Sequence, residues 1–201
     1  MNRRDFLKFV TIAAIAASVL SFCVVTNSQE KEKMNKTASL NPKKILVVYF
    51  SHSGNTREIA NQIKTATGGD IFELVPVNPY PAAYQAVVDQ AKKEISANFK
   101  PELKNKLADI SQYDVIFIGS PNWWSTIAPP VVTFLTSYDL SGKTIVPFFT
   151  HGGGSIGHCE TDVRKHCPKS TVLKSLYIYG ESVKNAQSEV SEWLREIKII
   201  K

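Results

Sequence analysis

From Lys44 onward, apolar residues are concentrated in short continuous runs. The runs lie at residues 45–50, 70–75, 114–119, 144–149 and 171–179. Short runs without polar alternation are typical of parallel strands that are buried on both faces. The stretches between them include helical spacing, as with Ile59, Ala60 and Ile63. We therefore predict an α/β domain over residues 44–201, in which parallel strands alternate with helices.

The N-terminal region has a different pattern. Arg3 and Arg4 precede the sequence Phe-Leu-Lys, and residues 9–25 carry no charge. A basic start followed by an apolar stretch is the layout of an export signal. The paired arginines resemble the twin-arginine motif, whose machinery exports proteins that are already folded. We expect an export signal over residues 1–27 and a location in the periplasm or cell envelope.

Two alternatives to a cleaved signal stay open. The apolar run at residues 9–20 is shorter than the ~20 strongly apolar residues of a spanning helix, so a retained membrane anchor is the second choice. Cys23 resembles a lipoprotein attachment site, although the bulky Phe22 stands where a small residue is expected. Residues 28–43 are polar with almost nothing to bury, and we expect a flexible tether there.

The net charge of +6 suggests nucleic acid as a partner until its distribution is considered. Residues 1–27 contribute +2 and residues 28–44 contribute +3. Residues 45–201 have sixteen Lys and Arg and fifteen Asp and Glu, and so contribute only +1. The basic surplus therefore belongs to the export signal and the tether. We expect no nucleic-acid partner, and only transient membrane contact through the signal.

The first candidate site follows the strand at residues 45–50. Its residues are Ser51, His52, Ser53, Gly54, Asn55 and Thr56. Small hydroxyl residues and a glycine at the start of a helix favour phosphate binding, because free N–H groups and the helix dipole point at the anion. The loop lacks the lysine of a triphosphate loop and the glycines of a dinucleotide fingerprint, which favours a monophosphate. Simple helix capping is the alternative.

Two further loops follow predicted strands at the same edge of the sheet, where open α/β sheets bind ligands. In the loop at residues 120–130, the candidates are Pro121, Asn122, Trp123 and Trp124. In the loop after residue 149, they are Thr150, His151, Gly152, Gly153 and Gly154. A tryptophan offers a platform for stacking a planar ring, and three glycines expose bare backbone to its polar edge. The sequence does not decide which tryptophan stacks and which plugs the following helix.

The first loop resembles the phosphate loop of the flavodoxins, which holds the 5′-phosphate of FMN. Pro-Asn-Trp-Trp together with Thr-His-Gly-Gly-Gly resembles one flavodoxin-like branch in particular, and the likeness covers most of residues 44–199. The resemblance implies a three-layer fold of the short-chain type, with a five-stranded parallel sheet of order 2-1-3-4-5 and helices on both faces. It also implies FMN as cofactor. Tyr80 and Tyr84 either lie near the open edge of the flavin or pack a helix start.

Three functions are compatible with these residues. The first is an electron-transfer protein that works outside the cytoplasm and is exported with FMN in place, with an unknown redox partner. The second is an FMN-dependent NAD(P)H oxidoreductase that acts on a quinone or a nitro compound. The third is a surface module that has lost the flavin. The three loops contain no acidic residue, and we expect His151 to donate to the ring and raise its potential.

The sequences His158-Cys159 and His166-Cys167 raise the question of metal binding. Neither pair has metal-ligand spacing, so we predict no metal site. A disulfide between the two cysteines stays open. An unbroken helix would separate their Cα atoms by ~12 Å, but Pro168 suggests that the helix ends before Cys167.

Overall fold

A computed structural model describes residues 43–153 and 157–201. The expected export signal at residues 1–27, the tether at 28–43 except Lys43, and Gly154 lie outside the described residues. The described part of the chain forms one compact unit from Lys43 to Lys201. None of its helices is both long enough and apolar enough to cross a bilayer.

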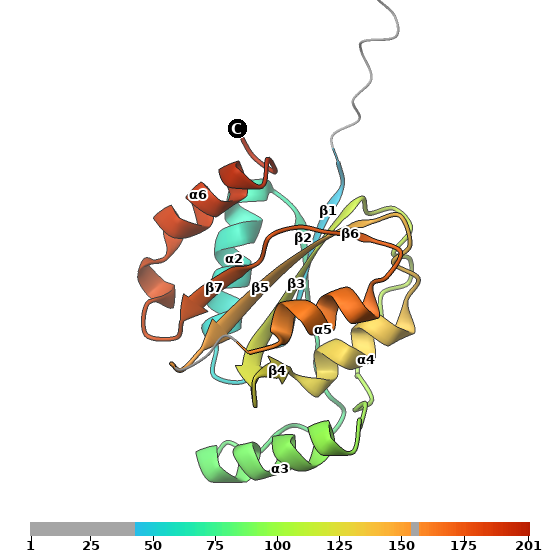
Figure 1. Ribbon diagram of the computed structural model, residues 1–201, viewed down its shortest axis with the longest axis vertical. Helices are drawn as coiled ribbons and strands as arrows, with labels where there is room; N and C mark the ends of the chain where they lie inside the picture. The colour runs from blue at the N-terminus through green and yellow to red at the C-terminus, as the bar shows by residue number, and fades with distance from the viewer. Residues whose placement is uncertain (1–42, 154–156) are drawn as a thin grey trace, which may run out of the picture. The chain divides into compact units, whose positions relative to one another are not determined.

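Strands and helices alternate along most of this unit (Figure 1). The strands are β1 (Ile45–Tyr49), β2 (Asp70–Glu73), β3 (Val115–Trp123), β4 (Thr126–Ile127), β5 (Thr144–His151), β6 (Thr171–Val172) and β7 (Leu176–Tyr179). The helices are α2 (Asn55–Thr67), α3 (Tyr84–Ser96), α4 (Pro129–Ser137), α5 (Cys159–His166) and α6 (Gln187–Glu196), with a 3-10 turn η1 at Val183–Asn185.

The sheet has the order β2-β1-β3-β5-β6, and all of these neighbours are parallel. This confirms the predicted order 2-1-3-4-5, because β4 is a two-residue addition that pairs antiparallel with β3. The fold is the flavodoxin-like α/β fold that the sequence implied.

The predicted last strand at residues 171–179 is divided into β6 and β7, which both pair with β5. The division lies beside Pro147 in β5, which has no N–H to donate. The carbonyl of Ile145 accepts a hydrogen bond from the N–H of Leu173, so the nitrogen of Pro147, two residues on, faces the same neighbour. The missing donor explains the interruption of the ladder.

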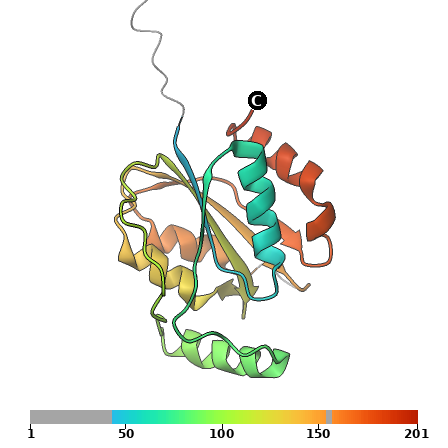
Figure 2. The same cartoon turned by 180° about the vertical axis from the view of Figure 1, so that it is seen from behind.

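Four helices cover the two faces of the sheet, as predicted (Figures 1 and 2). On one face, Ile59 and Ile63 of α2 and Trp193 of α6 pack in one core cluster with the sheet. On the other face, Phe134 of α4 and Val163 of α5 belong to a second cluster. Helix α3 departs from the prediction, because it lies beyond the end of the sheet and covers neither face (Figures 1 and 2).

The loop predicted at residues 120–130 is largely a hairpin. β3 continues through Trp123, and its last residues pair with β4, so that Asn122 faces Ile127 and Trp123 faces Thr126. The two turn residues, Trp124 and Ser125, have positive φ angles of 53° and 67°. The apolar pattern ends at Gly119, whereas the strand continues because backbone pairing does not require apolar side chains.

Candidate functional site

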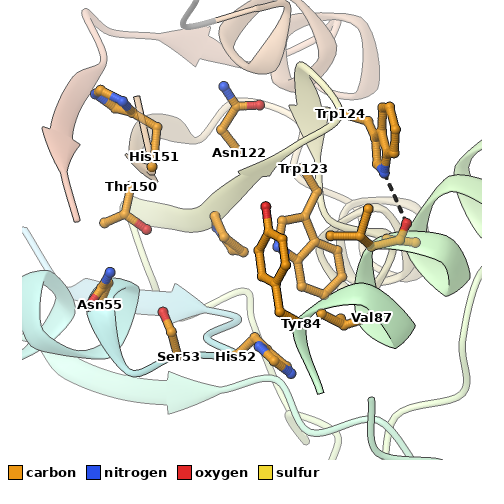
Figure 3. Close-up of a pocket in the computed structure, with 14 residues that line it drawn as sticks. His52, Ser53, Asn55, Tyr84, Val87, Asn122, Trp123, Trp124, Thr150 and His151 are labelled. Atoms are coloured by element: carbon orange, nitrogen blue, oxygen red, sulfur yellow. Dashed lines mark hydrogen bonds between the residues drawn. The ribbon is translucent and has the colours of Figure 1, made fainter. Parts of the chain in front are cut away.

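The carboxyl ends of β1, β3 and β5 meet at one cavity of about 460 Å³ (Figure 3). It is lined by His52, Ser53, Asn55, Tyr84, Val87, Val88, Ala91, Pro121, Asn122, Trp123, Trp124, Thr150, His151 and Gly152. All three predicted loops therefore contribute to one site, and α3 adds a fourth wall. The other described residues of the prediction, Ser51, Gly54, Thr56 and Gly153, belong to the same loops but do not line this cavity.

The start of α2 forms the polar end of the cavity. Gly54 precedes the helix with a φ of 94°, and no side chain caps the helix N-terminus. The N–H of Gly54 donates to the Ser51 hydroxyl at 3.2 Å. The capping alternative therefore does not describe this loop. Uncapped N–H groups at the positive end of a helix dipole form a site for an anion such as a phosphate.

Two other members of the first loop connect it to its neighbours. Thr56 is buried, and its hydroxyl shares a hydrogen bond of 2.8 Å with the hydroxyl of Thr150 near the end of β5. The His52 ring donates from Nε2 to the carbonyl of Pro81 at 2.8 Å. Thr56 therefore connects the first loop to β5, and His52 connects it to the segment that leads into α3.

The two tryptophans point in different directions (Figure 3). The Trp123 ring packs edge-on against Phe50 and Tyr80, with ring centroids 5.4 and 5.0 Å apart. The Trp124 indole instead donates from Nε1 to the carbonyl of Val88 in α3 at 3.0 Å. Trp123 is therefore the fixed ring that is available for stacking, and Trp124 contacts α3 rather than plugging the helix that follows it.

The structure also separates the two tyrosines. Tyr80 supports the far side of Trp123, and its hydroxyl donates to Glu94 in α3. Burial, together with the neighbouring Glu94 carboxylate, raises the pKa of Tyr80. Tyr84 lines the cavity and is 80% exposed, so it stands at the mouth of the site. The structure therefore places Tyr84 in the lining of the cavity, whereas Tyr80 packs against Trp123 and bonds to the last turn of α3.

The end of β5, with Thr150 and His151, forms the wall opposite Trp123 (Figure 3). The N–H of Gly153 donates to Nδ1 of His151 at 3.2 Å, so the neutral imidazole carries its proton on Nε2. The His151 ring lies 5.9 Å from the ring of Tyr179 in β7. Gly152 has open space where a side chain would begin, which leaves its backbone accessible.

Sequence reasoning missed the contribution of α3 and of Gly180. Val87, Val88 and Ala91 have helical apolar spacing, but that spacing does not say which surface the helix covers. The N–H of Gly180 donates to the carbonyl of His151 at 2.8 Å. A Cβ at residue 180 would lie 2.5 Å from the side-chain nitrogen of Asn55, so any larger residue would have to displace the Asn55 side chain. A lone glycine after a strand gave no signal of this contact.

The cavity lining is close to neutral. It contains no Asp, Glu, Lys or Arg, and its only titratable side chains besides Tyr84 are the imidazoles of His52 and His151. Just outside the lining, the ammonium of Lys92 lies 4.9 Å from the centre of the Trp124 ring. A ligand that gains negative charge would therefore meet no carboxylate in the lining.

The cysteines of α5 lie away from this chemistry. Cys159 and Cys167 are both free and buried, which answers the question that the sequence left open. α5 does end before Cys167, but the N–H of Cys167 still donates to the Val163 carbonyl. Burial raises the pKa of Cys159 to about 12 and that of Cys167 to about 11, so neither is a thiolate near neutral pH. The described residues contain no cluster of His, Cys, Asp and Glu suited to a metal ion.

Comparison with known proteins matches this geometry to one family. Residues 44–197 match the family described as flavodoxin. A comparison with proteins of curated function gave no match.

Many solved structures are similar to this chain, among them the following three. A candidate flavoprotein from Bacteroides eggerthii is 33% identical over 79% of this chain and 99% of its own, with a TM-score of 0.69. A second, from Bacteroides uniformis, is 31% identical over 77% of this chain and 99% of its own, with a TM-score of 0.68. A flavoprotein from Lactobacillus acidophilus, solved in complex with FMN, is 26% identical over 73% of this chain and 99% of its own, with a TM-score of 0.59.

Proposed function

This chain belongs to the flavodoxin family, and on that premise we propose that it binds FMN without a covalent bond and transfers electrons. One observation carries the proposal: an uncapped helix start, a fixed tryptophan ring and bare backbone surround one cavity of about 460 Å³. That volume is within the range of ~300 to 1,000 Å³ that is usual for small-molecule sites. The Lactobacillus acidophilus flavoprotein in complex with FMN supports the choice of ligand.

The lining residues fit the parts of FMN one by one. The N–H groups at the start of α2, with Ser53 and Asn55, would hold the phosphate. Trp123 would stack on the isoalloxazine ring, because its position is fixed by Phe50 and Tyr80. The backbone around Gly152 would meet the polar edge of the ring. Bound FMN supplies the electron chemistry, and the protein sets its position and surroundings.

The neutral lining bears on the redox potential. Reduction adds negative charge to the flavin, and carboxylates nearby would oppose it. The described lining has no carboxylate, and His151 presents a ring whose Nε2 carries a proton. We expect a midpoint potential above that of flavodoxins whose ring is surrounded by acidic residues.

The proposal includes a location outside the cytoplasm. The paired Arg3 and Arg4 before an uncharged stretch support export of the folded protein. Export in the folded state agrees with a non-covalent cofactor, because FMN acquired in the cytoplasm would be lost on unfolding. A fusion of residues 1–43 to a reporter that must fold before export tests this, with Arg3→Lys and Arg4→Lys together as the control that should abolish export.

Spectroscopy of the domain from Lys43 to Lys201 tests FMN binding. This domain corresponds to almost the whole length of the solved relatives, so it is expected to fold alone. We expect a yellow protein, or uptake of added FMN with quenching of its fluorescence. Trp123→Ala should weaken binding about tenfold or more, and Trp123→Phe should weaken it less, because a ring remains. A colourless domain that takes up no FMN would contradict the proposal.

A stopped-flow experiment then separates the carrier from the oxidoreductase. We expect NADPH alone to reduce the bound FMN slowly and a protein donor to reduce it quickly. Rapid reduction by NADPH, followed by reoxidation with a quinone, would instead assign the chain to the NAD(P)H oxidoreductases.

A further inference from the structure

Helix α3 turns its apolar side to the cavity instead of the sheet. Tyr84, Val87, Val88 and Ala91 all line the cavity, and only Val87 and Ala91 of the helix are buried. The helix lies beyond the end of the sheet in both views (Figures 1 and 2). An apolar helix face is normally covered by a packed layer. Here part of that face borders an open cavity, so a ligand in the cavity would complete the packing of α3.

The side chain of Trp124 attaches α3 to the β3–β4 hairpin. Its Nε1–H donates to the carbonyl of Val88 at 3.0 Å, and the ammonium of Lys92 lies 4.9 Å from the ring centre. Both partners lie on α3, one helical turn apart. Trp124 is 51% exposed, so its contribution lies in these two contacts more than in burial.

The hairpin turn that carries Trp124 adopts a costly backbone. Trp124 and Ser125 are both left-handed, with φ angles of 53° and 67°. A two-residue turn of this kind favours Asn and Gly, and other residues are strained there. Backbone strain that persists beside a ligand cavity points to a functional constraint.

The β3–β4 turn is also bonded to the start of α5. The N–H of His158 donates to the carbonyl of Ser125 at 2.6 Å. A Cβ at residue 157 would lie 2.3 Å from that carbonyl oxygen, so only Gly157 allows the close approach. In addition, the Thr126 hydroxyl donates to Asp162 in α5. The turn is therefore anchored to α5, and Trp124 extends from a fixed base to α3.

We propose that α3 is a lid over the dimethylbenzene edge of the bound FMN, and that Trp124 is the positioning residue that holds the lid closed. The inference rests on the proposed FMN site. With the phosphate at the start of α2 and the polar ring edge at Gly152, the apolar edge is left for the apolar wall at Val87, Val88 and Ala91. A partner that needs this edge must then displace α3, so the contact of Trp124 with α3 controls access to the flavin.

Reconstitution of the Lys43–Lys201 domain with 8-chloro-FMN tests the lid directly. An added thiolate forms a carbon–sulfur bond at position 8 of the dimethylbenzene ring and displaces chloride, which shifts the visible spectrum. We expect the bound flavin to react at least about tenfold more slowly than free 8-chloro-FMN. Trp124→Phe keeps the ring beneath Lys92 but removes the N–H donor, and it should speed the reaction about three- to tenfold.

Ser125→Gly is the matched control. It keeps Trp124 and the carbonyl that His158 contacts, and it suits the left-handed turn, so the reaction should stay slow. Hydrogen exchange without flavin gives a second measure of the contact. The amides of α3 should exchange faster in Trp124→Phe than in the unchanged domain. In Ser125→Gly they should exchange at the same rate as in the unchanged domain.

Each contrary result has its own meaning. A bound flavin that reacts as fast as free 8-chloro-FMN would show that α3 does not cover the edge. A slow reaction with no effect of Trp124→Phe on either rate or exchange would show that Trp124 does not hold the lid. If neither FMN nor 8-chloro-FMN changes its spectrum or fluorescence on mixing with the domain, the domain does not bind flavin, and both the FMN site and the lid are wrong.

Discussion

The hydroxyl groups of Thr56 and Thr150 join the first and third loops of the site. They lie 94 residues apart in sequence and 2.8 Å apart in space, in a buried position. We expect Thr150→Val to lower the free energy of unfolding by ~1 to 3 kcal/mol, because the Thr56 hydroxyl is then buried without its partner. Urea titration of the purified domain measures the change.

The double variant supplies the control for this pair. Thr56→Val combined with Thr150→Val should cost less than the sum of the two single substitutions, because no hydroxyl is left unpaired. Strict additivity would mean that the two hydroxyl groups do not stabilise each other.

His151 allows a prediction about the redox potential. We expect His151→Ala to lower the midpoint potential of bound FMN, because a hydrogen-bond donor near the ring favours the negative charge that reduction adds. The Nδ1 contact with Gly153 leaves the proton on Nε2, where the ring can donate. Potentiometric titration measures the effect, and His151→Asn, which keeps a donor, should fall in between. An unchanged or higher potential in the alanine variant would contradict the role of His151.

The directions of the two tryptophan side chains could not be predicted from the sequence. The sequence identified both Trp123 and Trp124 as candidate site residues, since paired tryptophans after a strand need a partner for their rings. Their opposite directions follow from the alternation of side chains and from the turn that begins at Trp124. That turn has none of the residues that mark a two-residue hairpin, so it could not be predicted from the residues at positions 124 and 125.

Among the elements, β3 has the tightest packing requirement at Gly119. A Cβ there would lie 2.2 Å from the ring of Phe148 in β5 and 2.7 Å from Cβ of Tyr49 in β1. We expect Gly119→Ala to lower the free energy of unfolding by ~1 to 3 kcal/mol through overpacking. Thermal or urea unfolding measures it.

Gly152→Ala is a matched comparison for the same change in composition. Nothing lies within 4 Å of the position of its Cβ, so the unfolding free energy should be unchanged or slightly raised. Equal losses in the two variants would mean that the cost comes from backbone entropy and not from contact with Phe148.

Most elements were predictable because the signals for them are local. Continuous apolar runs mark β1, β3 and β5, and helical spacing marks α2, since burial on two faces or on one stripe leaves its period in the sequence. β4 was missed because it has two residues and no period. The split of the last strand depends on Pro147 in β5, which is distant in sequence from residues 171–179.

For the whole molecule, the buried thiols predict sensitivity to alkaline pH. Cys159 and Cys167 have pKa values of about 12 and about 11 in the fold, against an ordinary 9.0 in an unfolded chain. The contribution of the two thiols to the free energy of unfolding is therefore fully present below pH 9. It falls as the pH rises towards 11 and then 12, because the unfolded chain releases protons that the folded protein retains. The loss is up to ~1.4 kcal/mol per pH unit for each thiol.

Urea unfolding at several pH values between 8 and 10.5 measures how the free energy of unfolding changes with pH. Cys159→Ala lowers stability at every pH through the cavity it leaves, but it should flatten the pH dependence. A slope that is the same in both proteins would show that the Cys159 thiol does not titrate on unfolding in this range.

The sequence by itself predicted an α/β domain of parallel strands and three loops at one sheet edge, because apolar runs, glycines and hydroxyl residues are local signals that do not depend on later packing. The order of the five strands came from the resemblance of these loops to those of the flavodoxins. The assignment of most of the positive charge to residues 1–44 also needs no structure.

Only the tertiary structure decided in which directions the two tryptophans point, that the cysteines form no disulfide, and that α3 lines the cavity instead of covering the sheet. Each of these depends on contacts between segments far apart in sequence, such as Trp124 with Val88 or Thr56 with Thr150. An amphipathic pattern requires that α3 bury its apolar side, but several surfaces satisfy that requirement equally. The choice among them is made by packing, where shape and hydrogen-bond partners in three dimensions distinguish one surface from another.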